Sequence, residues 1–190
     1  MLELKTPIGA QFAVAAAHTG AAPDPSAVKL TAASPGALVQ LAGWGTFAEA
    51  VEPALRILEF AGLGDYKTAR IADGSICYRL ARDRVLLRSN NIERLMRATS
   101  WLPPADVASL DLSHARWVLQ VEGARAPDLL ARLAPLDFSL PAFPVESFTQ
   151  TGIDHVGVLV HRRTAERFEV LVPYTWMDSI WRMSVASLPM

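Results

Sequence analysis

Short runs of hydrophobic residues, each bounded by turn-forming residues, divide residues 38–100 into six segments. Short runs rich in Val, Ile, Leu or Tyr are typical of strands, whereas apolar residues spaced three or four apart are typical of helices. The pattern therefore predicts a strand, a helix, three strands and a second helix. The segments are LVQL (38–41), a helix between residues 46 and 62, TARIA (68–72), ICYRL (76–80), RVLLR (84–88) and NIERLM (91–96).

The helix ends carry signals of their own. Thr46 and Glu49 have the spacing of a capping box, in which the threonine side chain and the glutamate side chain each accept from a backbone N–H. Pro53 removes one backbone hydrogen bond inside a helix. This helix therefore either kinks at Pro53 or begins near Glu52, with Pro53 in its first turn. For the second helix, Asn90 or Asn91 is the expected N-cap.

Residues 111–190 repeat the same order of segments. Pro127 opens the expected first helix of this half, and Pro135 follows its end. Thr175, together with Asp178, is expected to cap the last helix. The segments are RWVLQV (116–121), a helix over 127–133, SFTQT (147–151), VGVLV (156–160), FEVLV (168–172) and a helix from residue 175 to residue 183.

The two halves also share a short piece of sequence, because LVQLAG (38–43) matches VLQVEG (118–123). An internal duplication explains this likeness and the shared order of segments. Each half alone would leave one sheet face poorly covered, so the halves are expected to pack together. We predict an α+β fold with one domain over residues 36–190, made of two similar strand-helix-strand-strand-strand-helix units at 36–100 and 111–190.

Two segments fall outside these units. Residues 1–35 are rich in Ala, Gly, Pro and Ser and predict an N-terminal arm, either covering a neighbour in an assembly or lacking contacts, with a short strand near residues 28–31. Residues 101–111 are expected to link the halves, and Pro103 and Pro104 would stiffen this link.

Composition narrows the class of protein. Hydrophobic residues make up 51% of the chain, and the mean hydropathy is +0.22, which indicates a large core or apolar surface kept for a partner. The apolar runs are too short to span a bilayer, so we expect a soluble, cytoplasmic protein without a membrane partner. The net charge of −1 gives no global attraction to nucleic acid, and the one cysteine excludes an internal disulfide.

Common catalytic and metal-binding motifs do not occur in the sequence. There is no CxxC, HExxH, GxSxG or six-residue dinucleotide-binding glycine motif, and we expect no metal site and no catalytic residue. His155 and His161 would lie about 20 Å apart in an extended run, too far to share one ion. Cys77, inside a strand, is expected to be a buried apolar residue, and Ser113–His114 a turn rather than a dyad.

Three features keep functional alternatives open. Asp154, in the turn TGIDHV (151–156), is the candidate for a general base or a cofactor anchor, although aspartate is also common in turns. The arginines between Arg79 and Arg97 suit an acidic partner or a solvated face, and RNA is the alternative. Trp101, Trp176 and Trp181 are candidates for core packing or interface anchors, with the core favoured for Trp181.

Longer stretches resemble a known family. ADGSICYRLARDRVLLRS (72–89), DLSHARWVLQVEGARAPDLLARLAPLDF (111–138), FTQTGIDHVGVLVHR (148–162) and FEVLVPYTWMDSIW (168–181) resemble the gamma subunit of heterotetrameric sarcosine oxidase. More distantly, VEGARAPDLLARL (121–133) is similar to the aminomethyltransferase of the glycine cleavage system and its folate-binding relatives. The resemblance implies an aminomethyltransferase-like, folate-binding-domain-like fold.

The resemblance also implies a role. In that family the complex oxidatively demethylates sarcosine to glycine and passes the one-carbon unit to tetrahydrofolate. FAD, FMN, NAD, zinc and tetrahydrofolate are then expected in the partner alpha, beta and delta subunits, and this chain would be a structural subunit without catalytic residues of its own. Aminomethyltransferases carry a carboxylate where this chain has Val156 and Gly157, and Asp154 lies slightly before that place. The alternative is a stand-alone folate-binding, aminomethyltransferase-like protein that uses Asp154.

Overall fold

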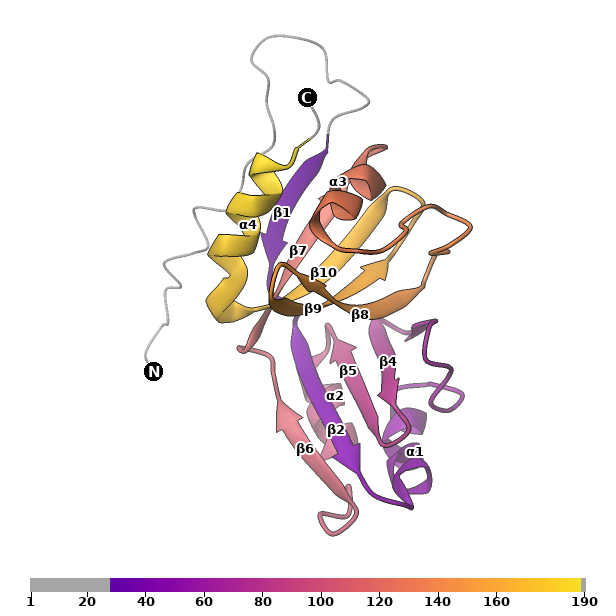
Figure 1. The fold of residues 1–190 in the computed structure, drawn as a ribbon. Helices are drawn as coiled ribbons and strands as arrows, with labels where there is room; N and C mark the ends of the chain where they lie inside the picture. The colour runs from indigo at the N-terminus through magenta and orange to yellow at the C-terminus, as the bar shows by residue number, and fades with distance from the viewer. Residues whose placement is uncertain (1–27, 189–190) are drawn as a thin grey trace.

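Two five-stranded antiparallel sheets form the centre of the computed structural model, which describes residues 28–188 (Figure 1). We call them sheet A and sheet B. Sheet A consists, in spatial order, of β1 (Lys29–Ala33), β7 (Arg116–Glu122), β10 (Arg167–Pro173), β9 (Val156–Arg162) and β8 (Phe148–Ile153). Sheet B consists of β6 (Val107–Asp111), β2 (Ala37–Gly43), β5 (Arg84–Ser89), β4 (Ser75–Ala81) and β3 (Arg70–Ala72).

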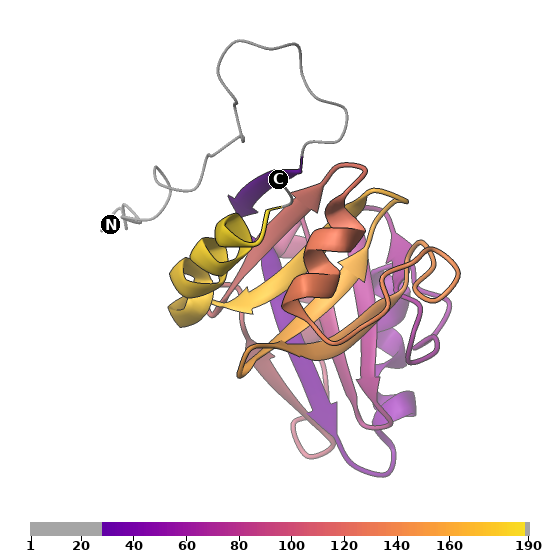
Figure 2. The same ribbon diagram turned by 45° about the horizontal axis from the view of Figure 1, so that its top comes forward.

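Each sheet is covered on one face by its own helices (Figures 1 and 2). The helices α1 (Phe47–Ile57) and α2 (Ile92–Thr99) pack on sheet B. On sheet A lie α3 (Ala126–Leu133) and α4 (Met177–Ala186), the latter preceded by the short 3₁₀ helix η1 (Tyr174–Trp176). The predicted α+β class is confirmed, and the order strand, helix, three strands, helix occurs in both halves of the chain.

The strand orders of the two sheets correspond. In each sheet, one edge strand comes from the half of the chain that forms the other sheet. β1 precedes β2 in the sequence but pairs with β7, with Lys29 opposite Glu122. β6 precedes β7 but pairs with β2, with Val107 opposite Gly43. The strand expected near residues 28–31 is therefore present as β1, whereas most of the predicted arm, residues 1–27, lies outside the described residues. The linker expected over residues 101–111 is wrong for residues 107–111, which form β6.

The helix caps differ from the sequence predictions at two of three places. Asn91 is the N-cap of α2, has extended backbone angles, and accepts from the backbone N–H of Arg94 at 2.9 Å. Thr46 directly precedes α1 but has a ψ of 10° instead of an extended backbone, and its side chain makes no capping hydrogen bond, so the predicted capping box is absent. α1 begins at Phe47 and continues through Pro53, so the alternative start of this helix near Glu52 is also wrong. The cap predicted at Thr175 is wrong because η1 occupies that segment.

Alternation along the strands sets the chemistry of the layer between the two sheets. In β10, Val170 and Val172 face the helices, whereas Leu171 packs in the cluster between the sheets. By the same period of two, Glu169 faces the other sheet. His161 in β9 lies two residues from Leu159, a member of the cluster between the sheets, so it too faces this layer. The layer is thus mostly apolar but receives a few buried polar side chains.

Other sequence expectations can be placed on this fold. Cys77 is buried among the side chains between sheet B and its helices, and Trp181 is buried against sheet A, both as predicted. Trp101 is 82% exposed and Trp176 39% exposed, so neither is a core residue. Among residues 28–188, no helix has the length and apolar character needed to cross a bilayer.

Candidate functional site

Two polar connections join the sheets through their shared layer. The first is a hydrogen-bonded chain of Tyr78, His161 and Glu146, which we call the neutral chain. The second is the arginine cluster, in which Arg88, Arg163 and Arg167 surround Glu169. Each connection includes a side chain from sheet B and a side chain from sheet A.

The neutral chain is fully paired. Tyr78 in β4 and His161 in β9 are both 0% exposed, and the Tyr78 hydroxyl lies 2.9 Å from His161 Nδ1. On the other side of the ring, His161 Nε2 lies 2.7 Å from Glu146 Oε2. The Glu146 carboxylate can only accept, so Nε2–H of the neutral ring donates to it and Nδ1 accepts from the Tyr78 hydroxyl.

Burial sets the charge of this chain. Desolvation, aided by the nearby charges of Arg163 and Arg88, lowers the pKa of His161 to about 3, so the ring stays neutral at physiological pH. Burial also raises the pKa of Tyr78 and that of Glu146 above their ordinary values. A tyrosine–histidine–carboxylate chain could move a proton, but here the phenol is completely enclosed. Its present arrangement holds β4 against β9.

The backbone around Glu146 holds its side chain in place. Glu146 has a φ of 64°, a left-handed conformation that is unfavourable for a residue with a side chain. Its backbone N–H donates to the Arg162 carbonyl at 2.8 Å, and its carbonyl accepts from the Ala69 N–H at 2.8 Å. These bonds tie the segment before β8 to both sheets and offset the strain of the turn.

The arginine cluster has a short central ion pair. Arg88 Nη1, on β5, lies 2.7 Å from Glu169 Oε2, on β10, and these side chains are only 11% and 5% exposed. Arg88 Nε donates to the Pro35 carbonyl at 2.7 Å, which fixes the guanidinium. A buried pair of this kind is held by hydrogen bonds on both partners, and removal of either partner leaves a buried charge.

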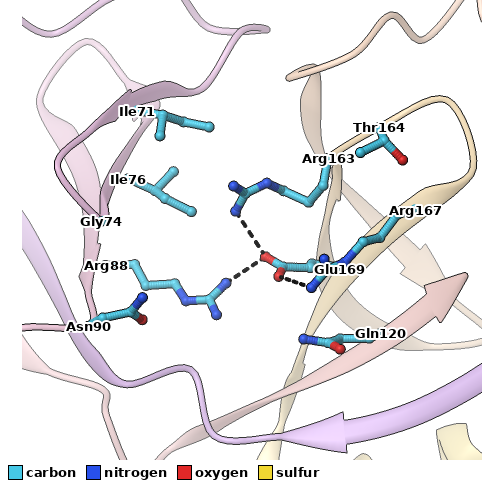
Figure 3. A pocket seen from close by; sticks show the side chains of 10 residues that line it. All are labelled: Ile71, Gly74, Ile76, Arg88, Asn90, Gln120, Arg163, Thr164, Arg167 and Glu169. Atoms are coloured by element: carbon cyan, nitrogen blue, oxygen red, sulfur yellow. Dashed lines mark hydrogen bonds and ion pairs between the residues drawn. The ribbon is translucent and has the colours of Figure 1, made fainter.

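Two further arginines approach the same carboxylate at longer range (Figure 3). Arg163 Nη1 lies 3.5 Å from Glu169 Oε2, and Arg167 Nη2 lies 4.0 Å from Glu169 Oε1. Their side chains are 26% and 41% exposed. Arg163 Nε also lies 3.9 Å from Glu146 Oε2. Three guanidinium groups therefore face two carboxylates, Glu169 and Glu146, which leaves an excess of one positive charge at this place.

The arginine cluster borders a cavity of about 410 Å³ between the sheets (Figure 3). Ile71 and Ile76 of sheet B form an apolar part of its wall. Gln120 of β7 also lines the cavity, and its side-chain oxygen accepts from Thr31. Ligand sites in proteins commonly combine this size with a few charged groups on a partly apolar wall. This cavity is the candidate functional site.

Asp154, the site residue that the sequence singled out, lies elsewhere. It has a φ of 54° in the turn between β8 and β9, where its carboxylate lies 2.6 Å from His155 Nδ1. Both side chains are more than half exposed, at 56% and 65%. The residues lining the cavity do not include Asp154. The turn prediction is confirmed, and Asp154 as an anchor or base stays a prediction.

The hairpin of β8 and β9 includes the positions where an aminomethyltransferase carboxylate is expected. Val156 is buried, and Gly157 is exposed with open space where a side chain would stand. Valine has an apolar side chain and glycine has none, so these positions do not fit the polar anchor of a folate ring.

The remaining candidates from the sequence are structural in their contacts. Burial raises the pKa of the Cys77 thiol to about 12, so it is not a thiolate at neutral pH. Ser113 accepts from the Leu38 N–H at 3.0 Å and donates to Asp111 at 2.6 Å, as expected for turn chemistry. Among residues 28–188, no three His, Cys, Asp or Glu side chains gather in a way that could hold a metal ion.

Three of the arginines between Arg79 and Arg97 make separate contacts. Arg79 stacks over the Tyr66 ring at 4.5 Å from its centre. Arg94 pairs with Asp73 and Glu59. Arg88 forms the buried pair with Glu169. An acidic partner or RNA at this segment stays a prediction.

The cavity residues on sheet A were not predicted from the sequence. Arg163, Arg167 and Glu169 lie on the hairpin of β9 and β10. A signal was available, because Glu169 interrupts an otherwise apolar run, FEVLV, that has the character of a fully buried strand. Buried carboxylates are almost always paired, so a cationic partner could have been expected.

Comparison with known proteins gives matches in structure only. No model of a known protein family matches the chain, and no curated protein matches it. The fold is similar to a chain of heterotetrameric sarcosine oxidase from Corynebacterium sp. U-96, solved with pyrrole 2-carboxylate. The TM-score is 0.72 at 23% identity, over 86% of this chain and 85% of that chain.

The fold is also similar to the glycine cleavage system aminomethyltransferase T from Bartonella henselae. The TM-score is 0.57 at 18% identity, over 83% of this chain and 45% of that chain. This chain thus corresponds to less than half of the aminomethyltransferase. The resemblance that the sequence indicated is found again in the fold.

Proposed function

We propose that this chain is a non-catalytic structural subunit of a cytoplasmic sarcosine-oxidase-type complex. Its partners would be the alpha, beta and delta subunits, which would hold FAD, FMN, NAD, zinc and tetrahydrofolate. The complex would oxidise sarcosine to glycine and transfer the one-carbon unit to tetrahydrofolate. The observation that carries this proposal is the likeness to a chain of a heterotetrameric sarcosine oxidase, because it extends over 85% of that chain rather than over one motif.

The duplication inferred from the sequence belongs to this proposal. The reciprocal placement of β1 and β6 is what two copies of one unit would produce if each copy lent its first strand to the other. Such an exchange makes the two halves interdependent, since neither sheet is complete without the other half. A pair of this kind suits a rigid body that supports a partner.

Exposed aromatic side chains offer a surface for a partner. Trp44, which directly follows β2, is 68% exposed, and Trp101, in the connection from α2 to β6, is 82% exposed. Leu110 on the edge strand β6 is 55% exposed. Tryptophan is among the residues most often found as interface anchors, and an unpaired edge strand can bind another chain.

Co-expression with the alpha, beta and delta subunits tests the proposal. Omission of this chain should reduce the yield of assembled complex and its sarcosine oxidase activity together. Trp101→Ser and Trp44→Ser should weaken co-purification, whereas Leu140→Ser, which changes a 49% exposed residue of the other half, should not. Assembly at full yield and activity without this chain would refute the structural role.

The likeness to an aminomethyltransferase gives a second candidate, a stand-alone folate-binding protein. Titration of the purified chain with tetrahydrofolate separates the two. Micromolar binding that is lost in Asp154→Ala would favour this candidate, and lack of binding would favour the subunit.

A further inference from the structure

The arginine cluster contains more positive charge than its own structure requires. Arg88 and Glu169 already form a short buried pair, with Arg88 also bonded to a backbone carbonyl. Arg163 and Arg167 add two positive charges at 3.5 and 4.0 Å from the same carboxylate, and Glu146, 3.9 Å from Arg163 Nε, offsets one of them. Their Nε–H groups are buried and have no hydrogen-bond acceptor. Unpaired buried donors are unfavourable, so an additional acceptor at this place would stabilise the protein.

The cavity beside these arginines has room for such an acceptor. Its volume of about 410 Å³ is within the range of small-molecule sites. Arg163 and Arg167 extend from the hairpin of β9 and β10 toward it, and the side-chain nitrogen of Gln120 points in the same direction (Figure 3). Planar guanidinium groups bind carboxylates through two parallel hydrogen bonds.

The apolar wall of the cavity favours an organic anion over a simple inorganic ion. Ile71 is 42% exposed and pairs in register with Ile76, and both line the cavity across from Arg163 and Arg167 (Figure 3). Inorganic phosphate would leave this apolar surface in water, whereas an aliphatic or aromatic body would cover it. Each buried CH₂ group contributes about 0.8 kcal/mol to transfer from water.

We propose that the cavity between the sheets binds a small organic carboxylate, with the carboxylate on Arg163 and Arg167 and the apolar body on Ile71 and Ile76. Glu169 holds Arg88 and limits the affinity by repulsion, so binding is reversible. The site does not depend on the proposed subunit role and is open to test on the full-length chain.

Isothermal titration calorimetry of the full-length chain with hexanoate, hexanamide and inorganic phosphate tests the inference. Hexanoate should bind at a single site. Hexanamide, which lacks the charge, and phosphate, which lacks the apolar body, should each bind at least about tenfold more weakly. Equal binding of phosphate would overturn the apolar part of the proposal, and lack of saturable hexanoate binding would overturn the whole.

Variants identify the residues. Arg167→Gln and Arg163→Gln should each weaken hexanoate binding about tenfold or more. Arg84→Gln serves as the matched control, because Arg84 is exposed at the start of β5 and does not line the cavity. Circular dichroism spectra confirm that each variant is folded. Undiminished binding in Arg167→Gln, whose side chain is 41% exposed and therefore tolerant of change, would place the ligand elsewhere.

Discussion

The neutral chain and the arginine cluster both join sheet B to sheet A, yet they solve the problem of buried polarity differently. In the neutral chain, each hydrogen-bonding group of His161 has one partner, and the ring carries no charge at physiological pH. In the arginine cluster, three cations face Glu169 beside an open cavity. Full pairing of the buried polar groups is typical of a structural connection, whereas surplus positive charge beside a cavity is typical of a ligand site.

Removal of the central carboxylate should have the largest effect on stability. Glu169→Gln leaves Arg88 buried without a counter-charge and increases repulsion among the three arginines, so the free energy of unfolding should fall by about 3–5 kcal/mol. Urea denaturation measures this change. Glu166→Gln, an exposed glutamate in the same hairpin, should change the free energy by less than about 0.5 kcal/mol. Similar values for the two variants would show that the buried pair does not stabilise the fold.

Loss of the phenol should have the next largest effect. Tyr78→Phe keeps the ring that packs edge-on against Phe148 at 5.1 Å but leaves His161 Nδ1 without a donor. An orphaned buried acceptor costs about 1–3 kcal/mol, measurable by urea denaturation. Tyr66→Phe is the control, because Tyr66 is 50% exposed and keeps its ring under Arg79. If Tyr78→Phe were as mild as the control, the neutral chain would not hold the sheets together.

Local features of this structure could be predicted from the sequence, whereas contacts between distant segments could not. Short apolar runs bounded by turn residues located the strands, and Asn91 and Pro127 were recognised at helix starts because their signals are local. The pairing of β1 with β7 was not predictable, since nothing near residue 30 specifies a partner about ninety positions away. The cavity was missed for the same reason, because Arg88 and Glu169 lie 81 positions apart and meet only when the sheets pack.

Acidification from pH 7.5 to pH 5.5 should destabilise the fold through His161. The pKa of His161 is about 3 in the folded protein against 6.5 ordinarily, so the unfolded state takes up the proton first as the pH falls. The free energy of unfolding should decrease by about 1.4 kcal/mol between pH 7.5 and pH 5.5. Glu146 opposes the trend, because burial raises its pKa and the folded state therefore binds this proton more readily than the unfolded state.

Urea denaturation at each pH measures this dependence. His161→Gln retains a donor toward Glu146 without a titrating ring and should flatten the dependence. A slope that persists in His161→Gln would assign the titration to another group.

The smallest effect on stability is expected at the edge of the arginine cluster. This variant distinguishes most clearly between a ligand site and a structural connection. Arg167 is 41% exposed and 4.0 Å from Glu169, so Arg167→Gln should change the free energy of unfolding by less than about 1 kcal/mol in buffer alone. With hexanoate present, the unchanged protein should gain thermal stability as the ligand binds the folded state, and Arg167→Gln should lose most of that gain. A residue that matters only when ligand is present belongs to a binding site. A loss of several kcal/mol in buffer would instead make Arg167 a structural partner of Glu169 and remove the distinction between the two connections.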